Sequence, residues 1–270
     1  MSESNPTPRK LGLAMSGGAA RGIAHLGVLE ALDELQLPIG RLSGVSSGGL
    51  AAVFYAAGIP PREVLRLLTD TRFLRLLRPA FGRGLVRVSM LERLFAAHLP
   101  GNQTFADLRL PVTLAATDLA AGETVYFDEG LLTPALLATS AVPVVFQPVE
   151  YQGRVLVDGG LLNNLPIEPL EGRADLAVVG VHTNVLNLEA PITTMRHVAE
   201  RTFFLAISTN VAPRMARCEL VLQPAELRRF SILDLRHAAE LFDIGYRYTL
   251  ARAGELRALV EKPAPAVDFG

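Results

Sequence analysis

Short apolar runs alternate along the chain with longer segments in which apolar residues recur at helical spacing. The strand-like runs cover residues 11–15, 41–45, 111–117, 154–157, 176–181 and 218–222. Helical spacing is clear at Val28, Leu29 and Leu32 after the first run, and small apolar residues fill 47–58 after the second. Strands that alternate with helices favour a mainly parallel sheet covered on both faces. We therefore predict an α/β fold with three layers, α/β/α.

The two ends of the chain depart from this pattern. Residues 1–9 are polar and contain two prolines, and the residues after Lys262 are low in complexity. We predict a disordered tail over 1–9, a single folded domain over 10–258 and a C-terminal tail over 259–270. No segment within 10–258 has the composition of a linker between domains.

Secretion and membrane signals are also absent from the pattern. The apolar run after Lys10 is broken by glycines and an arginine, so it lacks the apolar core of about 7–15 residues that a signal peptide needs. Two uncharged stretches, 42–61 and 130–149, contain or end in prolines and do not form continuous lipid-facing helices. We expect a cytoplasmic protein without a transmembrane segment, whose contact with a membrane would be peripheral.

Composition narrows the classes of partner. Hydrophobic residues make up 50% of the 270 residues and the mean hydropathy is +0.30, which indicates a large buried core. A net charge of −1 argues against nucleic acid as a general partner. The single cysteine, Cys218, excludes an intramolecular disulfide and suits a reducing compartment. We expect no cofactor and no metal site.

The sequence GVSSG at residues 44–48 is a candidate nucleophile elbow. It lies between the second strand-like run and the helix predicted over 47–58. In a G-x-S-x-G elbow the serine occupies a sharp strand-to-helix turn, and glycines such as Gly44 and Gly48 let the two elements pass closely. Ser46 would then lie near a helix N-terminus that favours developing negative charge. A glycine-rich packing turn is the alternative for this pentapeptide alone.

A second glycine-rich segment, SGGAARG at residues 16–22, joins the first predicted strand to a helix. It is not a P-loop, because Ile23 follows Gly22 where a lysine is required, and the second strand does not end in the acidic residue of a dinucleotide-binding fold. The remaining interpretation is a loop whose backbone amides face a developing oxyanion. Arg21 would anchor this loop or steer anionic substrates.

The third candidate is Asp158, which ends the fourth strand-like run and precedes Gly159 and Gly160. A free Asp has a pKa of about 3.9, so burial must raise the pKa before the carboxylate can serve as a base near neutral pH. The apolar strand before it favours such desolvation. A tight turn is the alternative use of Asp-Gly-Gly, but together with the two upstream motifs the pattern favours acyl transfer through a serine.

Five ordered segments of the chain resemble the patatin-like phospholipases, in particular their compact bacterial members. The segments are SGGAARGIAHLGVL, GVSSGG, ATDLAAGE, TSAVPVVFQPV and VDGGLLNNLP, and the resemblance extends from about Leu11 to about Leu250. It implies a patatin-like α/β/α fold. It also implies hydrolysis of lipid carboxyl esters by a Ser–Asp dyad, without the histidine of ordinary lipases.

The resemblance assigns a role to each motif. Ser46 matches the nucleophile and Asp158 the proton acceptor, and the backbone amides of Gly17, Gly18 and Ala19 match the oxyanion hole. The family usually has a third glycine where this chain has Ala19. Alanine keeps the amide but resists a positive φ.

A histidine-based triad is the mechanistic alternative. Four of the five histidines lie in helical patterns, where a surface or capping position is the usual explanation: His25, His98, His197 and His237. His182 instead follows the strand-like run 176–181, and Ser46, Asp158 and His182 have the chain order of an α/β-hydrolase triad. We rank this triad below the dyad, because the oxyanion loop and the Asp-Gly-Gly context fit the dyad better.

Residues 62–87 form a basic segment, with seven arginines against two acidic residues. Basic amphipathic segments can lie on anionic membrane surfaces, although a solvated face is the commoner explanation. This segment is therefore a candidate membrane contact or lid.

Two classes of function follow from the whole pattern. The first is a serine acyl hydrolase acting on lipid or short-chain esters, and the second is a non-catalytic regulatory or lipid-binding protein with the same fold. Ser46, Asp158 and the glycine loop together favour the enzyme, because a protein that only binds does not need all three.

Overall fold

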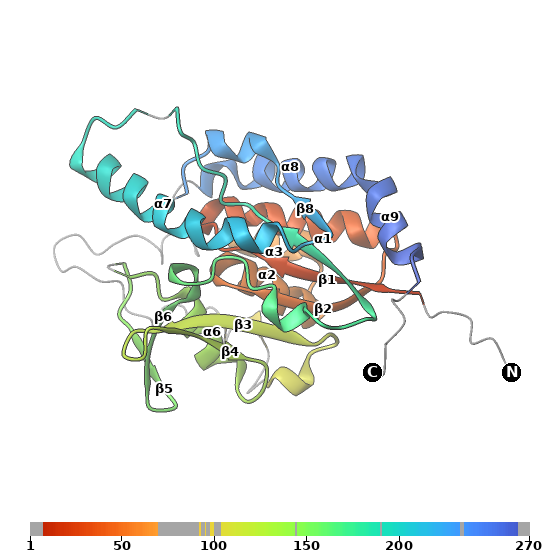
Figure 1. Cartoon of the computed structure of the whole chain (residues 1–270), viewed down its shortest axis with the longest axis horizontal. Coiled ribbons are helices and arrows are strands. Elements are labelled where there is room, and N and C mark those ends of the chain that lie inside the picture. The colour runs from red at the N-terminus through yellow and green to blue at the C-terminus, as the bar shows by residue number, and fades with distance from the viewer. Residues whose placement is uncertain are drawn as a thin grey trace, which may run out of the picture.

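The computed structural model describes residues 8–69, 92, 95, 98–99, 104–143, 145–189, 191–232 and 235–263. Within these residues a single mixed sheet is covered by helices on both faces (Figure 1). The predicted three-layer α/β/α fold is therefore confirmed.

Within the described ranges eight strands form the sheet, in the order β5-β6-β3-β2-β1-β7-β8, with β4 also paired to β3. Their bounds are β1 Lys10–Met15, β2 Ile39–Gly44, β3 Val112–Asp118, β4 Glu123–Phe127, β5 Val149–Tyr151, β6 Arg154–Asp158, β7 Leu176–Val181 and β8 Leu220–Leu222. The strands β3, β2, β1, β7 and β8 are parallel to their neighbours in this series, whereas β4, β5 and β6 are joined by antiparallel pairs. The six predicted strands are confirmed to within two residues, and the structure adds β4 and β5.

Within the described residues, α-helices follow β1, β2, β4, β7 and β8, and two consecutive helices follow both β2 and β8. The α-helices are α1 Ala24–Glu34, α2 Ser46–Ala56, α3 Pro61–Thr69, α6 Leu132–Ser140, α7 Met195–Met215, α8 Ala238–Ala251 and α9 Ala253–Glu261. Short 3-10 turns are η1 Ala19–Ile23, η2 Phe105–Asp107, η3 Gly159–Leu161, η4 Glu168–Leu170, η5 Ala225–Arg229 and η6 Leu235–His237. The helices predicted after the first two strands correspond to α1 and α2.

Alternate residues of β1 enter two separate cores. Leu13 and Met15 lie in the larger core, which contains residues of α1, α2, α6 and α8. Ala14 lies in the smaller core on the other face, where Ile207 and Val211 of α7 pack. A central parallel strand covered on both faces is apolar throughout, which explains the uninterrupted run over 11–15.

The folded part extends beyond both predicted boundaries. Arg9, which the sequence assigns to the N-terminal tail, is buried, and its Nη1 donates a hydrogen bond to Glu219 Oε2 at 2.8 Å. At the other end α9 continues to Glu261, and Leu259 belongs to the larger core. Among the described residues, no helix is both long enough and apolar enough to cross a membrane.

Most of the predicted basic segment lies outside the described residues, including Arg72, Arg75 and Arg78. Its described beginning, α3, packs against α1 and α8. Arg62 forms an ion pair with Glu30 of α1, with 2.5 Å between Nε and Oε1, and its guanidinium lies 5.2 Å from the ring centre of Phe242 on α8. Arg62 therefore contributes to packing between helices.

We predict that a methyl group at Gly27 separates α1 from α8. A Cβ there would lie 2.0 Å from the carbonyl oxygen of Phe242 and 2.7 Å from the amide nitrogen of Tyr246. Gly27→Ala should lower the free energy of unfolding by about 2 kcal/mol, as overpacking against rigid backbone does. Urea unfolding measures this change.

The matched control is Gly254→Ala in α9, where a Cβ would meet no atom within 4 Å. This variant should gain about 0.5–1 kcal/mol, because alanine is the better helix former. Equal stability of the two variants would show that α1 and α8 are not packed through this contact.

Candidate active site

Ser46 lies at the sharp turn between β2 and α2, as the first residue of the helix. Its φ is 52°, in the left-handed region that non-glycine residues rarely adopt. Two hydrogen bonds hold the turn: the Ser46 amide donates to Thr139 Oγ1 at 2.9 Å, and the Val45 amide donates to the Met15 carbonyl at 3.2 Å. Backbone strain of this kind is found where the surrounding structure imposes it, commonly at functional sites.

Gly44 and Gly48 allow backbone contact on both sides of this turn. A Cβ at Gly48 would lie 2.3 Å from the Met15 carbonyl oxygen, and a Cβ at Gly44 would lie 2.7 Å from the backbone of Gly49. Any larger residue would move α2 away from β1 or from β2. The two predicted glycines therefore hold the serine turn against the end of β1, where the glycine-rich loop begins.

The glycine-rich loop forms one wall beside Ser46. Gly17, Gly18 and Ala19 line the same cavity as Ser46. The amides of Gly17 and Gly18 have no hydrogen-bond acceptor within the described part of the chain, so they are available to an acceptor in the cavity. Ala19 has a φ of 48°, so it adopts the left-handed conformation in which glycine is commoner.

Arg21 holds this loop from behind. Its buried guanidinium donates to backbone carbonyls in the C-terminal third of the chain: Val185 (2.6 Å), Phe230 (2.8 Å) and Arg228 (3.5 Å). Arg21 does not line the cavity that contains Ser46. Of its two predicted roles, the structure favours anchoring. Gly22 is equally constrained, because a Cβ there would lie 2.1 Å from Ser47 Oγ.

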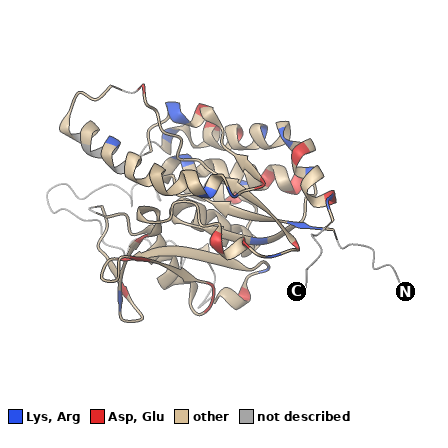
Figure 2. Ribbon diagram, in the orientation of Figure 1, with Lys and Arg blue, Asp and Glu red and all other residues tan. Residues whose placement is uncertain are grey.

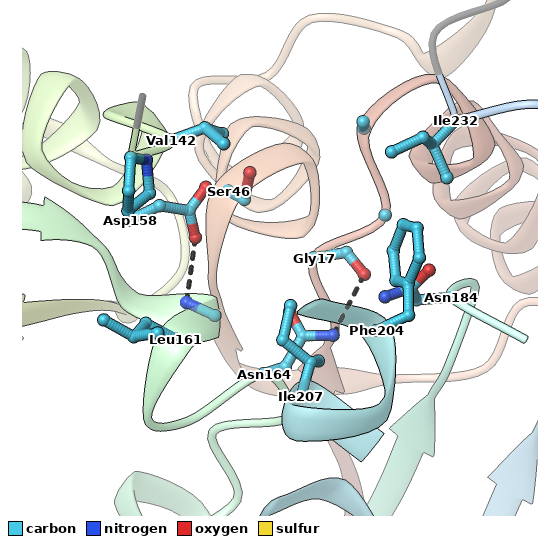
Figure 3. Close-up of a pocket in the computed structure, with 14 residues that line it drawn as sticks. Gly17, Ser46, Val142, Asp158, Leu161, Asn164, Asn184, Phe204, Ile207 and Ile232 are labelled. Carbon is cyan, nitrogen blue, oxygen red and sulfur yellow. Dashed lines mark hydrogen bonds between the residues drawn. The ribbon is translucent and has the colours of Figure 1, made fainter. Parts of the chain in front are cut away.

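Asp158 ends β6, and Figure 3 shows its carboxylate next to Ser46. Burial raises the pKa of Asp158 to about 6, although hydrogen bonds from the Ser46 side chain and the Gly160 amide oppose this rise. The Gly160 amide lies 2.8 Å from Oδ1. A Cβ at Gly159 would lie 2.4 Å from the Ala115 carbonyl, so the turn after Asp158 touches β3. A carboxylate with this pKa is ionised at neutral pH and is still basic enough to accept a proton.

Asn164 connects the turn after Asp158 to the glycine-rich loop. Its side-chain Nδ2 donates to the Gly17 carbonyl at 3.4 Å (Figure 3). The backbone amide of Asn164 donates to Asn210 Oδ1 at 2.9 Å. From α7, Asn210 Nδ2 donates to two carbonyls of the same turn at 3.4 and 3.2 Å. The sequence pattern does not single out either asparagine. Their roles depend on contacts between distant parts of the chain.

His182 is not placed to complete a triad. It follows β7, and its Nδ1 lies 3.1 Å from Nε2 of Gln223. Burial lowers its pKa to about 4, with a smaller contribution from the charge of Arg21. Within the described part of the chain, His182 neither lines the cavity nor hydrogen-bonds to Ser46 or Asp158.

His25 differs from the surface or capping position that its helical pattern predicts, because it is completely buried. Its Nε2 lies 2.8 Å from the Ser16 carbonyl oxygen and 3.3 Å from Thr183 Oγ1. Burial lowers the pKa of His25 to about 4, so the ring is neutral at pH 7. It supports the start of the glycine-rich loop. His197 and His237 lie at the beginnings of α7 and α8, as predicted.

The cavity that these groups share is small, and apolar side chains surround it. Its volume is about 70 Å³, and Val142, Leu161, Phe204, Ile207 and Ile232 line it from different sides (Figure 3). Pockets that enclose a drug-sized ligand measure about 300–1,000 Å³. The cavity can therefore hold a reacting ester group but not a whole lipid. Within the described ranges, no three His, Cys, Asp or Glu side chains gather as metal ligands.

The raised pKa of Asp158 predicts a pH-dependent effect of Asp158→Asn on stability. The folded protein favours the neutral carboxyl, so its stabilising contribution is complete below pH 3.8 and is lost as the pH rises through about 6. Asparagine stays neutral and avoids this loss. Relative to wild type, Asp158→Asn should gain about 3 kcal/mol between about pH 3 and pH 7, from a shift of about two pKa units. Urea unfolding at several pH values measures the difference.

The control for this measurement is Asp107→Asn. A hydrogen bond from the Thr104 amide lowers the pKa of Asp107, so its stabilising contribution is lost as the pH falls. The asparagine variant should therefore lose stability as the pH rises, with the opposite sign. A pH-independent difference for Asp158→Asn would mean that this carboxyl is not buried.

Known proteins resemble this chain in sequence. A family model described as patatin-like phospholipase matches residues 13–171, which include Ser46, Asp158 and the glycine-rich loop. An NTE family protein of Mycobacterium tuberculosis is 38% identical over 175 residues, 63% of this chain and 48% of that protein. Lysophospholipase NTE1 of Cryptococcus neoformans is 27% identical over 192 residues, 64% of this chain and 11% of that protein. The chain thus spans half or less of the length of these relatives.

Solved structures with low sequence identity share the fold. VipD from Legionella pneumophila superposes with a TM-score of 0.63 at 15% identity, covering 93% of this chain and 68% of that one. Human GIVD cytosolic phospholipase A2, in complex with methyl gamma-linolenyl fluorophosphonate, gives a TM-score of 0.52 at 14% identity, with 93% and 58% covered. The sequence match extends over more than half of the chain and contains the serine elbow, the glycine-rich loop and the Asp-Gly-Gly turn, so the chain belongs to the patatin-like phospholipase family.

Proposed function

We propose that a single domain over residues 9–261 is a lipid acyl hydrolase that cleaves carboxyl esters, with Ser46 as nucleophile and Asp158 as proton acceptor. The observation that carries this proposal is the position of a strained serine beside a buried carboxyl whose pKa is raised to about 6. Membership of the patatin-like phospholipase family supports a lipid ester as the substrate. The apolar side chains around the cavity suit the part of an acyl chain next to the ester group.

In the first half-reaction Asp158 accepts the proton of Ser46 Oγ while the oxygen attacks the ester carbonyl carbon. The carbonyl oxygen becomes negative and accepts hydrogen bonds from the amides of Gly17, Gly18 and Ala19. The tetrahedral species collapses, and Asp158 returns the proton to the departing alcohol oxygen. The acyl group is then bound to Ser46 as an ester.

In the second half-reaction water replaces the alcohol. Asp158 accepts a proton from this water as the water attacks the acyl carbon, and the same amides hold the second oxyanion. Collapse breaks the bond to Ser46 Oγ, which regains a proton from Asp158, and the fatty acid leaves. The carboxylate thus serves as base and acid in both steps.

The alternative of a non-catalytic lipid-binding protein is less well supported. Binding does not require Ser46 in a left-handed conformation or a buried carboxylate beside it, and both are energetically unfavourable. A triad with His182 is also disfavoured, because His182 bonds to Gln223 instead.

Ser46→Ala should abolish hydrolysis of p-nitrophenyl butyrate and covalent labelling by a fluorophosphonate. The matched control is Ser47→Ala, because Ser47 Oγ is buried and has no hydrogen-bond partner within the described part of the chain. This variant should be labelled like wild type. Intact-mass spectrometry after labelling gives the readout, and a labelled peptide that maps to Ser47 would reverse the assignment.

Asp158→Asn should lower kcat by about 10²–10⁴, the usual contribution of a general base. His182→Gln should keep most of the activity. In wild type, kcat/KM should rise with pH through about 6, because Asp158 must be ionised in the free enzyme. If His182→Gln is as inactive as Asp158→Asn, the triad is correct and the dyad is wrong.

A further inference from the structure

The segment that leads into α7 and the first half of that helix expose large apolar side chains. Leu188, Ile192, Met195, Val198 and Leu205 are between 43% and 81% exposed. They account for half of the ten large apolar side chains that the described residues expose, within 18 positions of the chain. We call these five residues the α7 outer face. Exposed large apolar residues that gather in one part of the chain, unlike scattered ones, point to an interaction site.

Helical geometry places three of these residues on one side of α7. Met195, Val198 and Leu205 are spaced by three and seven residues, and positions 202 and 209 on the same side are threonines. A helix side that faces water normally carries charged residues. Figure 2 shows α7 in tan over most of its length, in contrast to the charged residues along α8 and α9. The outer side of α7 thus has the residue composition of a surface that a partner covers.

The opposite side of the same helix reaches the candidate active site. Phe204 and Ile207 of α7 line the cavity that contains Ser46. A helix with its side chains is about 10–12 Å across. A surface bound to the α7 outer face would therefore lie about one helix diameter from the reacting groups.

The volume of the cavity indicates which kind of surface binds the α7 outer face. At about 70 Å³ the cavity does not enclose a lipid, so most of each acyl chain must remain outside it. An acyl chain in water is unfavourable, whereas in a lipid aggregate it stays in an apolar phase. A site that admits only the ester region is best supplied from such an aggregate.

We propose that the α7 outer face docks on the surface of a lipid aggregate and brings the cavity to within about one helix diameter of that surface. The proposal rests on the proposed function, because it assumes a lipid ester as substrate. The contact is apolar, since no charged residue occupies positions 195, 198, 202, 205 or 209. It therefore differs from the salt-sensitive contact that the basic segment 62–87 would make.

Binding to vesicles of neutral phosphatidylcholine tests this proposal. All proteins carry Ser46→Ala, so that hydrolysis cannot alter the vesicles. This parent should co-sediment with vesicles equally at 0.1 and 0.5 M salt, because only exposed charges are screened. Adding Met195→Gln and Leu205→Gln should weaken partitioning at least about tenfold, since burying each apolar side chain contributes on that scale.

Two controls separate apolar contact from damage to the fold. Met195→Leu with Leu205→Met keeps the apolar area at the same positions and should bind like the parent. Leu131→Gln changes another exposed leucine, at the start of α6, and should also bind like the parent. The same surface variants are also made in the protein that keeps Ser46. There they should hydrolyse p-nitrophenyl butyrate at the wild-type rate, which tests the proposed function separately.

Several results would overturn the proposal. The parent could fail to bind the vesicles or lose its binding at high salt. The glutamine variant could bind as well as the parent, or the Leu131→Gln control could lose as much binding as the glutamine variant. Sedimentation velocity completes the test. If the parent is a dimer and the glutamine variant a monomer, the α7 outer face joins two copies of this chain, and docking on lipid is wrong.

Discussion

The candidate site depends on the backbone contact between the beginning of α2 and the end of β1. Position 48 has no room for a Cβ beside the Met15 carbonyl, and the Val45 amide bonds to that same carbonyl. This contact fixes the turn that carries Ser46 relative to the loop that continues from β1. The packed backbone of the sheet therefore sets the position of Ser46 relative to the loop amides, and the side chains of Thr139, Asn164 and Arg21 hold the two segments there.

Burial is the second constraint, and it acts on several groups at once. It raises the pKa of Asp158 to about 6 and lowers the pKa of His25 and His182 to about 4. At neutral pH the carboxyl is therefore charged, while the rings of His25 and His182 are neutral. Burial thus keeps Asp158 basic enough to accept a proton and keeps both histidines uncharged.

The sequence predicts the local parts of this arrangement well and its long-range parts poorly. The strand runs, the serine elbow, the glycine loop and the Asp-Gly-Gly turn are short motifs whose geometry depends on adjacent residues. Thr139 and Asn164 lie in segments that carry the family resemblance, but they bond to residues 93 and 147 positions away, so no local pattern shows what they contact. His25 has the helical spacing of many surface residues, and only the packing of the loop shows that it is buried. Strand β4 has partly exposed residues and no apolar run, so its pairing with β3 is not evident from composition.

The contacts of Arg21 limit how far the chain can be shortened from its C-terminal end. The family match stops at residue 171, yet the carbonyls that hold the Arg21 guanidinium belong to residues 185, 228 and 230. A fragment cut after the matched region would contain the serine, the aspartate and the glycines but would lose these three acceptors of the buried cation. Loss of hydrogen bonds to a buried guanidinium is costly, so the loop would be held less firmly. The C-terminal third, outside the family match, thus belongs to the smallest unit that keeps the glycine loop in shape.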